Sequence, residues 1–88
     1  MKITLNLQGC ATPEAVQEAL RRGLAFPDYY GNNLDALYDM LTQWSRSCTV
    51  GLRLPGVPAA GVKDYLPRVK RVFEDAAREN ENIIFRCE

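Results

Sequence analysis

Asp35 and Asp39 are the ionisable residues whose spacing most clearly suggests a shared role. They lie four residues apart, and Thr42 follows three residues later. Residues at these spacings share one face of a helix, so the three side chains would project together. Like charges four residues apart destabilise a helix by about 0.2–0.5 kcal/mol, and residues 26–44 contain no lysine or arginine to relieve them. The pattern fits an anionic face for a cationic partner, or an ordinary solvated face whose cations come from elsewhere in the fold.

Aromatic residues flank this acidic pair. Tyr29, Tyr38 and Trp44 belong to the residue types enriched at protein–protein binding hot spots. Trp44 also continues an apolar stripe that begins with Leu34 and Leu37 at helical spacing. We expect one of the adjacent tyrosines at positions 29 and 30 to point into the core. The stretch therefore supplies core residues and candidate contact residues together.

Enzyme chemistry is poorly supported by this sequence. The chain contains no histidine, the side chain that titrates most readily near neutral pH, and a cysteine nucleophile would have no imidazole base. Carboxylate pairs can replace histidine, but 88 residues leave little room for the cleft that a sugar substrate needs. No glycine-rich phosphate-binding motif is present. We therefore expect a binding protein rather than an enzyme, and no cofactor.

The cysteines are expected to be free thiols. Cys10, Cys48 and Cys87 include no C-x-x-C pair, and a zinc site without histidine would have to use thiolates and carboxylates alone. Three free thiols that act as small apolar residues suit a reducing compartment. We expect no metal site.

The charge balance argues against nucleic acid as the partner. Eleven basic and eleven acidic residues give a net charge of zero, whereas a phosphate backbone requires a concentrated basic face. The basic groups at 21–22 and 68–71 lie close to acidic residues, which predicts salt-bridged helix surfaces. No apolar run approaches the ~18 residues of a membrane span, and the alternating start of the chain is unlike a signal peptide. We expect a cytoplasmic protein that binds neither nucleic acid nor membrane.

Hydrophobic periodicity and capping residues predict alternating strands and helices. Thr12 and Asn33 are candidate N-caps, and Gly23 is a candidate left-handed C-cap. The expected strands are 2–7, 48–54 and 83–87, and the expected helices are 13–23, 34–44 and 67–79, with room for one helical turn in the loop after residue 54. Helical crossovers between strands imply a parallel sheet. The sequence therefore predicts a single α/β domain with a three-stranded parallel sheet flanked by three or four helices.

One run of residues resembles a known family signature. Residues 26–39 read FPDYYGNNLDALYD, which is similar to the signature of the barstar family, intracellular inhibitors of barnase-type ribonucleases. That signature is an apolar residue, Pro, an acidic residue, Tyr-Tyr-Gly, any residue, Asn-Leu-Asp-Ala-Leu, an aromatic residue and Asp. The segment VFEDAARENENIIF at 72–85 resembles the last helix and strand of the family. The resemblance implies a barstar-like single domain over residues 1–88 and a non-catalytic function.

The resemblance also implies roles for individual residues. Asp39 matches the aspartate that enters the phosphate-binding site of the ribonuclease, and Asp35 matches a second acidic contact. Positions at or beside the contact surface are matched by Tyr29, Asn33, Tyr38, Thr42 and Trp44, and a more distant acidic contact is matched by Asp75. Tyr38 stands where the family commonly has tryptophan, which changes the contact shape but keeps a flat aromatic ring. Glu79 falls near an acidic family position, where a solvated helix end is the favoured interpretation.

The hypothesis from the sequence is therefore a ribonuclease inhibitor. Its acidic helix face would mimic RNA phosphates and block the active site of a barnase-like extracellular ribonuclease. The alternative is a protein-binding module of the same fold directed at another basic protein that is not a ribonuclease. In both cases we expect a monomer when the protein is free.

Overall fold

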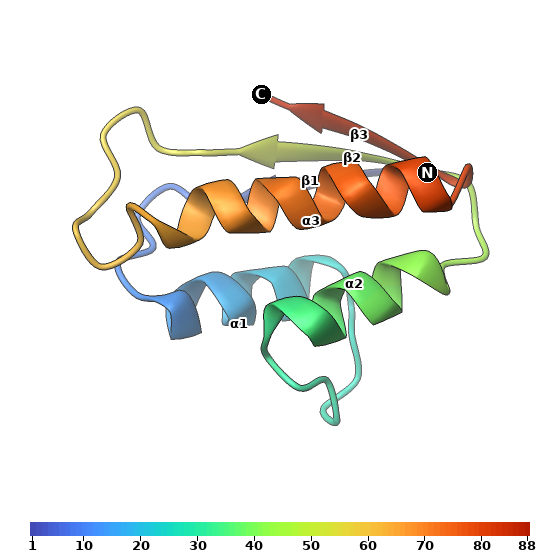
Figure 1. The fold of residues 1–88 in the computed structure, drawn as a ribbon, viewed down its shortest axis with the longest axis horizontal. Coiled ribbons are helices and arrows are strands. Elements are labelled where there is room, and N and C mark those ends of the chain that lie inside the picture. The colour runs from blue at the N-terminus through green and yellow to red at the C-terminus, as the bar shows by residue number, and fades with distance from the viewer.

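Two consecutive helices separate the first strand from the second, and one helix separates the second strand from the third (Figure 1). The computed structural model describes all residues from Met1 to Glu88. The elements in chain order are β1 (Lys2–Asn6), α1 (Pro13–Gly23), α2 (Leu34–Thr42), β2 (Cys48–Arg53), α3 (Tyr65–Glu79) and β3 (Ile83–Cys87). None of the three helices is both long and apolar enough to cross a lipid bilayer.

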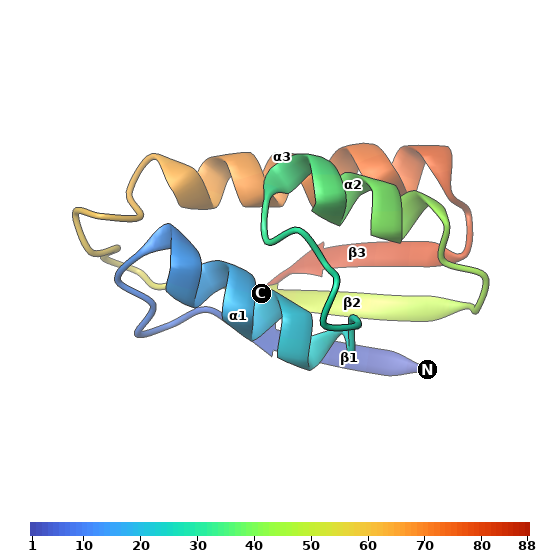
Figure 2. The same cartoon turned by 90° about the horizontal axis from the view of Figure 1, so that it is seen from below.

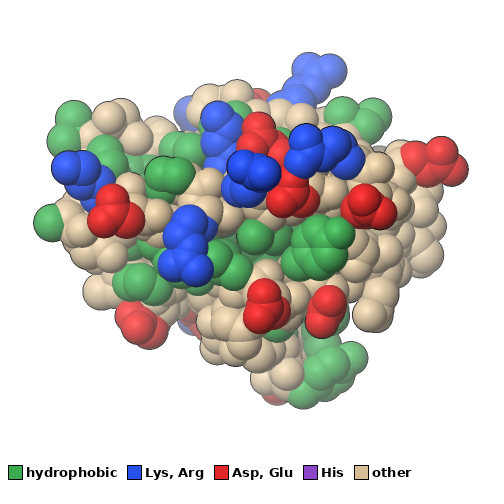
Figure 3. All heavy atoms as spheres, in the orientation of Figure 1, with side chains coloured by type: hydrophobic (Ala, Val, Ile, Leu, Met, Phe, Trp, Pro, Cys, Tyr) green, Lys and Arg blue, Asp and Glu red, His purple; other side chains and the backbone are tan.

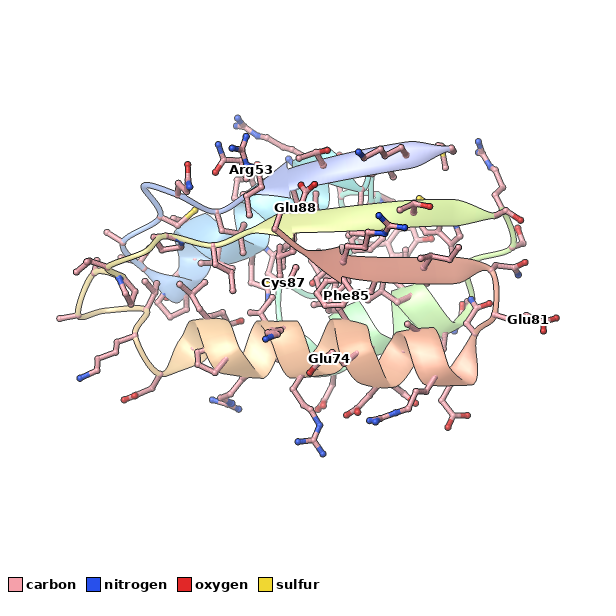
Figure 4. The ribbon with its side chains drawn as sticks, turned by 90° about the horizontal axis from the view of Figure 1, so that it is seen from above. Arg53, Glu74, Glu81, Phe85, Cys87 and Glu88 are labelled. Carbon is pink, nitrogen blue, oxygen red and sulfur yellow. The ribbon has the colours of Figure 1, made fainter.

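The three strands form a parallel sheet in the order β1-β2-β3. Leu5 of β1 pairs with Leu52 of β2, and Val50 of β2 pairs with Phe85 of β3. All three helices cover one face of the sheet (Figure 2), and the opposite face is not covered by any helix (Figure 4). The alternation of side chains along β1 and β2 sends the apolar set toward the helices and polar residues, including Arg53, toward solvent. In β3 the alternation instead leaves Ile84 exposed, at 56%.

The core lies between the sheet and the helices. Phe73 of α3 is fully buried and stacks on Phe85 of β3 with ring centroids 5.2 Å apart. Leu37 and Leu41 bring the apolar side of α2 into the same cluster. Because α2 packs against α3 as well as over the core, its opposite side faces outward, and this side carries the acidic residues.

The predicted fold class agrees with the structure, with three helices rather than four. The loop after β2 forms turns at residues 60–64 in place of a further helix, and α3 begins at Tyr65, two residues before the expected start. The helix prediction that extended to Trp44 is wrong at its end, because α2 stops at Thr42. Trp44 therefore continues the apolar stripe in the sequence without being part of the helix.

The N-cap predicted for α1 agrees with the structure, but the C-cap predicted for it does not. Thr12 Oγ1 accepts a hydrogen bond from the Ala15 amide at 3.1 Å, with Pro13 as the first helical residue. The prediction of a left-handed C-cap at Gly23 is wrong. Ala25 has the positive φ, 55°, after α1 ends, while a Cβ at Gly23 would collide with the side chain of Leu5 on β1. Glycine at position 23 therefore permits close packing of α1 on the sheet.

Truncation of Phe73 tests this account of the core. Phe73→Ala removes a fully buried ring, and we expect it to lower the free energy of unfolding by about 3–5 kcal/mol. Urea denaturation followed by circular dichroism measures the change. Val57→Ala is the control, because Val57 is 92% exposed and its truncation is expected to change stability by less than about 0.5 kcal/mol. Equal effects of the two substitutions would contradict the assignment.

Candidate partner-binding surface

A buried tyrosine fixes the loop that leads from α1 to α2. Tyr30 is 5% exposed, and its hydroxyl donates to Gln17 Oε1 at 2.5 Å, while Gln17 Nε2 donates to the Tyr65 hydroxyl at 2.6 Å. Burial, with a smaller contribution from Tyr65, raises the pKa of Tyr30, so its hydroxyl remains a donor at physiological pH. The neighbouring Tyr29 points outward and is 84% exposed. The expectation that one of the two tyrosines points inward is confirmed.

The beginning of α2 is capped by its own loop. Asn33 has an extended backbone, and its Oδ1 accepts from the Ala36 amide at 2.8 Å. Its Nδ2 donates to the Gly31 carbonyl at 3.1 Å. Both ends of the Asn33 carboxamide are therefore used locally, and the predicted N-cap is confirmed. The cap leaves Asp35 in the first turn of α2, where the helix dipole favours a negative charge.

The end of α2 is held by a residue distant in sequence. Asn80 follows α3 and is 8% exposed. Its Nδ2 donates to the carbonyls of Leu41 at 2.9 Å and Trp44 at 2.8 Å, and its Oδ1 accepts from the Asn82 amide at 3.0 Å. The last carbonyls of a helix have no partner within the helix. The Asn80 carboxamide satisfies one of them and ties the end of α2 to the turn between α3 and β3.

Asp35 and Asp39 are both exposed on α2 and form no ion pair in the chain. Figure 3 shows acidic side chains on α2, set apart from the charged side chains of α3 by hydrophobic side chains. Three of the other nine acidic residues do find cations within the chain. The ion pairs are Glu18 with Arg21 at 2.7 Å and with Arg22 at 2.8 Å, Asp28 with Arg21 at 3.6 Å, and Asp75 with Arg71 at 3.2 Å and with Arg78. The fold therefore supplies ion-pair partners to these carboxylates and to neither aspartate of α2.

The pairing on α1 is strong enough to shift titration. Hydrogen bonds from Arg21 and then Arg22 lower the pKa of Glu18 to about 2, and the hydrogen bond to Glu18 raises the pKa of Arg21. The salt-bridged surface predicted for the basic pair at 21–22 is thus confirmed. These two guanidinium groups are engaged on α1 and do not pair with the carboxylates of α2.

The other predicted contact residues lie in different surroundings. Thr42 Oγ1 donates to the Tyr38 carbonyl at 3.0 Å and to the Asp39 carbonyl at 3.1 Å, so its hydroxyl proton serves the helix itself. Tyr29 and Trp44 line an apolar hollow beside the start of β1, and Trp44 Nε1 is buried without a hydrogen-bond partner. Tyr38 is partly buried against the core cluster. Tyr29 and Trp44 therefore share one hollow that Tyr38 does not line, and the three rings form no stacked cluster.

The aspartates predicted to contact a partner lie in two places, and Asn33 accompanies the first two. Asn33, Asp35 and Asp39 line one hollow between the starts of α2 and α3. Asp75 lies on α3, where both of its ion-pair partners are arginines of the same helix. Its negative charge is compensated within the chain, in contrast to the charges of Asp35 and Asp39.

Sequence reasoning missed several residues that shape this surface. Asn80 and Gln17 are the buried polar residues, and neither belongs to a motif that would announce its contacts. Arg68 of α3 lines the same hollow as Asp35 and Asp39. The available signal for Arg68 was its spacing of four residues from Val72, a core-facing position of α3, which places it toward one side of the helix rather than on the fully solvated face.

The thiols and carboxylates form no cluster of three or more side chains suited to hold a metal ion. All three cysteines are free: Cys48 is buried, Cys10 is partly buried and Cys87 is exposed. Burial raises the pKa of the Cys10 and Cys48 thiols. The candidate surface therefore consists of carboxylates, amides, aromatic rings, the Thr42 hydroxyl and the Arg68 guanidinium.

The fold and this surface define a small α/β protein that presents a fixed acidic helix. Comparison with protein families matches the whole chain, residues 1–88, to the barstar model, described as barstar (barnase inhibitor), and the chain belongs to this family. Over 43 residues it is 46% identical to a protein of Bacillus subtilis (strain 168) named "Putative ribonuclease inhibitor YrdF". The match covers 49% of this chain and 47% of that relative, so it spans about half of the relative's length. Family membership supports ribonuclease inhibition as the general class of function.

Replacement of Asn80 tests whether it holds α2. Asn80→Ala removes the shortest bonds to the carbonyls of Leu41 and Trp44. The Leu41 carbonyl then keeps only the Trp44 amide at 3.2 Å, and the Trp44 carbonyl keeps only Asn82 Nδ2 at 3.3 Å. We expect a loss of about 0.5–1.5 kcal/mol in the free energy of unfolding. Amide hydrogen exchange should accelerate in the last turn of α2 more than in α1. Glu81→Ala is the control, because Glu81 is an exposed neighbour with no hydrogen bond from its side chain. Unchanged exchange in α2 would show that Asn80 does not restrain this helix.

Proposed function

We propose that this protein inhibits a barnase-like extracellular ribonuclease by placing the acidic face of α2 in the enzyme's phosphate-binding site. The observation that carries the proposal is the pair of exposed aspartates on α2 without any ion-pair partner in the chain. Membership of the barstar family supports a ribonuclease as the target. The basic side chains that normally hold RNA phosphates would supply the cations that the fold does not.

The carboxylates of Asp35 and Asp39 would occupy the positions of two RNA phosphates. Each can accept charge-assisted hydrogen bonds from lysine or arginine, which are roughly twice as strong as neutral ones. α2 is held at its start by the Asn33 cap and at its end by Asn80. Because the helix is already ordered, little conformational entropy is lost when it binds. The inhibitor therefore competes with RNA without presenting a cleavable bond.

The surrounding residues would contribute unequally to the interface. Asp39 is the first candidate for affinity, and Asp35 is the second acidic contact. The remaining proposed contacts are Tyr29, Asn33, Tyr38, Thr42, Trp44 and Asp75. Asp75 is expected to contribute less than the aspartates of α2, since a new cation must share it with Arg71 and Arg78. Tyr38, in the position where tryptophan is common, would give a smaller aromatic contact and a different choice of partner.

The proposed place of action is the cytoplasm, with the free inhibitor a monomer. A cell that makes a ribonuclease for export must block any enzyme that folds before export, because its own RNA is exposed. An inhibitor with free thiols suits such a reducing compartment.

Removal of one carboxylate tests the proposal. Asp39→Asn keeps the shape but removes the charge, and we expect the inhibition constant for a barnase-like ribonuclease to rise at least about 30-fold, from the ~2–5 kcal/mol lost when one partner of a buried charge pair is removed. RNA-cleavage assays over a range of inhibitor concentrations measure the change.

Glu88→Gln is the matched control for this experiment. It also removes one negative charge, but Glu88 lies on the uncovered face of the sheet, away from the helices (Figure 4). Thermal unfolding should show that both variants remain folded. Inhibition that survives Asp39→Asn unchanged would refute the site, and a chain that inhibits none of a panel of barnase-like enzymes would refute the function.

Salt gives an independent test of the electrostatic mechanism. The association rate should fall steeply between about 50 and 500 mM salt, where the Debye length shortens from more than 10 Å to less than 5 Å, and the dissociation rate should change less. The Asp35→Asn/Asp39→Asn double variant should show a flatter dependence of the association rate on salt. Stopped-flow mixing measures both rates. Equal salt dependence in the two proteins would place the steering charges elsewhere.

A further inference from the structure

Arg68 is the one cation that lines the hollow in which Asp35 and Asp39 are the acidic residues. It lines the space between the starts of α2 and α3 together with Asp35 and Asp39. It is exposed and forms no ion pair, although Arg71 and Arg78 of the same helix both pair with Asp75. The hollow thus presents two unpaired carboxylates and one unpaired guanidinium within one small surface.

This arrangement restricts the partner that can dock there. The proposed function brings the hollow against a basic site, and like charges placed together across an interface cost several kcal/mol. A guanidinium at this position would oppose docking on a uniformly basic pocket. The same guanidinium would favour docking on a basic pocket that also contains one negatively charged side chain.

The chemistry of RNA cleavage supplies such an anion. A site that activates a hydroxyl for attack on a phosphate requires a general base as well as the cations that hold the phosphate, and a glutamate or aspartate is a common base. The planar guanidinium offers a rigid fork of donors that matches a carboxylate. Two acids and one arginine on the inhibitor are therefore complementary to cations and one carboxylate on the enzyme.

We infer that Arg68 is a specificity-determining residue that recognises a carboxylate of the target ribonuclease, either its general base or an acidic residue on the rim of its active site. The inference rests on the proposed function, and it adds a positive charge to the two negative charges that would recognise the enzyme. Asp35 and Asp39 select for a basic site, and Arg68 selects among basic sites for those with a carboxylate in reach of α3.

The competing account is that Arg68 only screens the two aspartates. In that case its removal would strengthen the local negative potential and tighten binding to a basic partner. Recognition of a carboxylate predicts the opposite sign, because removal would leave the partner's carboxylate without its cation. The sign of the change in affinity therefore separates the two accounts.

The test uses a barnase-like ribonuclease that the wild-type chain inhibits. Arg68→Gln should raise the dissociation constant at least about 10-fold, and Arg68→Lys should recover part of the loss because it restores charge without the fork. Arg53→Gln is the control, since Arg53 lies on the uncovered sheet face (Figure 4) and its removal should change the constant by less than about twofold. Isothermal titration calorimetry measures all four proteins.

The enzyme side of the cycle identifies the carboxylate. The penalty of Arg68→Gln should disappear on an enzyme variant whose general base is changed to the amide, or on a variant whose rim carboxylate is changed in the same way. The enzyme variant on which the penalty disappears identifies the carboxylate that Arg68 contacts. A penalty that persists in every arm would overturn recognition of a carboxylate, as would equal or tighter binding by Arg68→Gln.

The outcomes also separate this inference from the proposed function. If Asp39→Asn weakens binding while Arg68→Gln does not, the acidic face stands and the role of Arg68 is refuted. If the wild-type chain binds no ribonuclease of the panel, both the function and the role of Arg68 are refuted.

Discussion

The carboxamide of Asn80 is the interaction on which the geometry of this surface most depends. It lies 39 residues from Leu41 in the chain, yet it donates to the carbonyls that close α2. α2 has only nine residues, and isolated helices shorter than ~12–15 residues are marginal in water. Leu37 and Leu41 pack α2 on the core, and the Asn80 carboxamide binds the carbonyls at its end. Without that anchor the acidic face would belong to a fraying segment.

The contacts that hold α2 at both ends also allow it to carry two negative charges on one face. Asp35 and Asp39 repel one another along the helix, and a helix stabilised only by local propensity would be weakened by them. Because α2 is fixed by Asn33 at its start and Asn80 at its end, the fold can tolerate this repulsion. Asp39 lies beyond the first turn, so the helix dipole gives it little relief. The unpaired charge is therefore maintained by tertiary contacts, and a partner's cations would relieve it.

Local signals in the sequence predicted the fold better than they predicted the site. Alternating residues gave the strand positions, and the N-caps Thr12 and Asn33 were predictable because a cap bonds to a residue three positions away. Contacts across the fold have no such local pattern. The sequence stripe through Trp44 could not reveal that α2 stops at Thr42, and nothing near Arg68 in sequence indicates that it shares a hollow with Asp39.

Because the net charge of the chain is zero, the positions of individual unpaired charges matter more for partner recognition. A neutral protein has little long-range field, so the partner senses individual charges only within about a Debye length, ~8 Å at physiological salt. Within that distance the potential is set by which residues are paired: Glu18 and Asp75 are neutralised on their own helices, whereas Asp35, Asp39 and Arg68 are not. The family motif on α2 supplies the acidic pair, but Arg68 comes from α3, outside that motif. If Arg68 recognises a carboxylate as we propose, two proteins that share the motif would differ in the partner they select through the residues of the neighbouring helix.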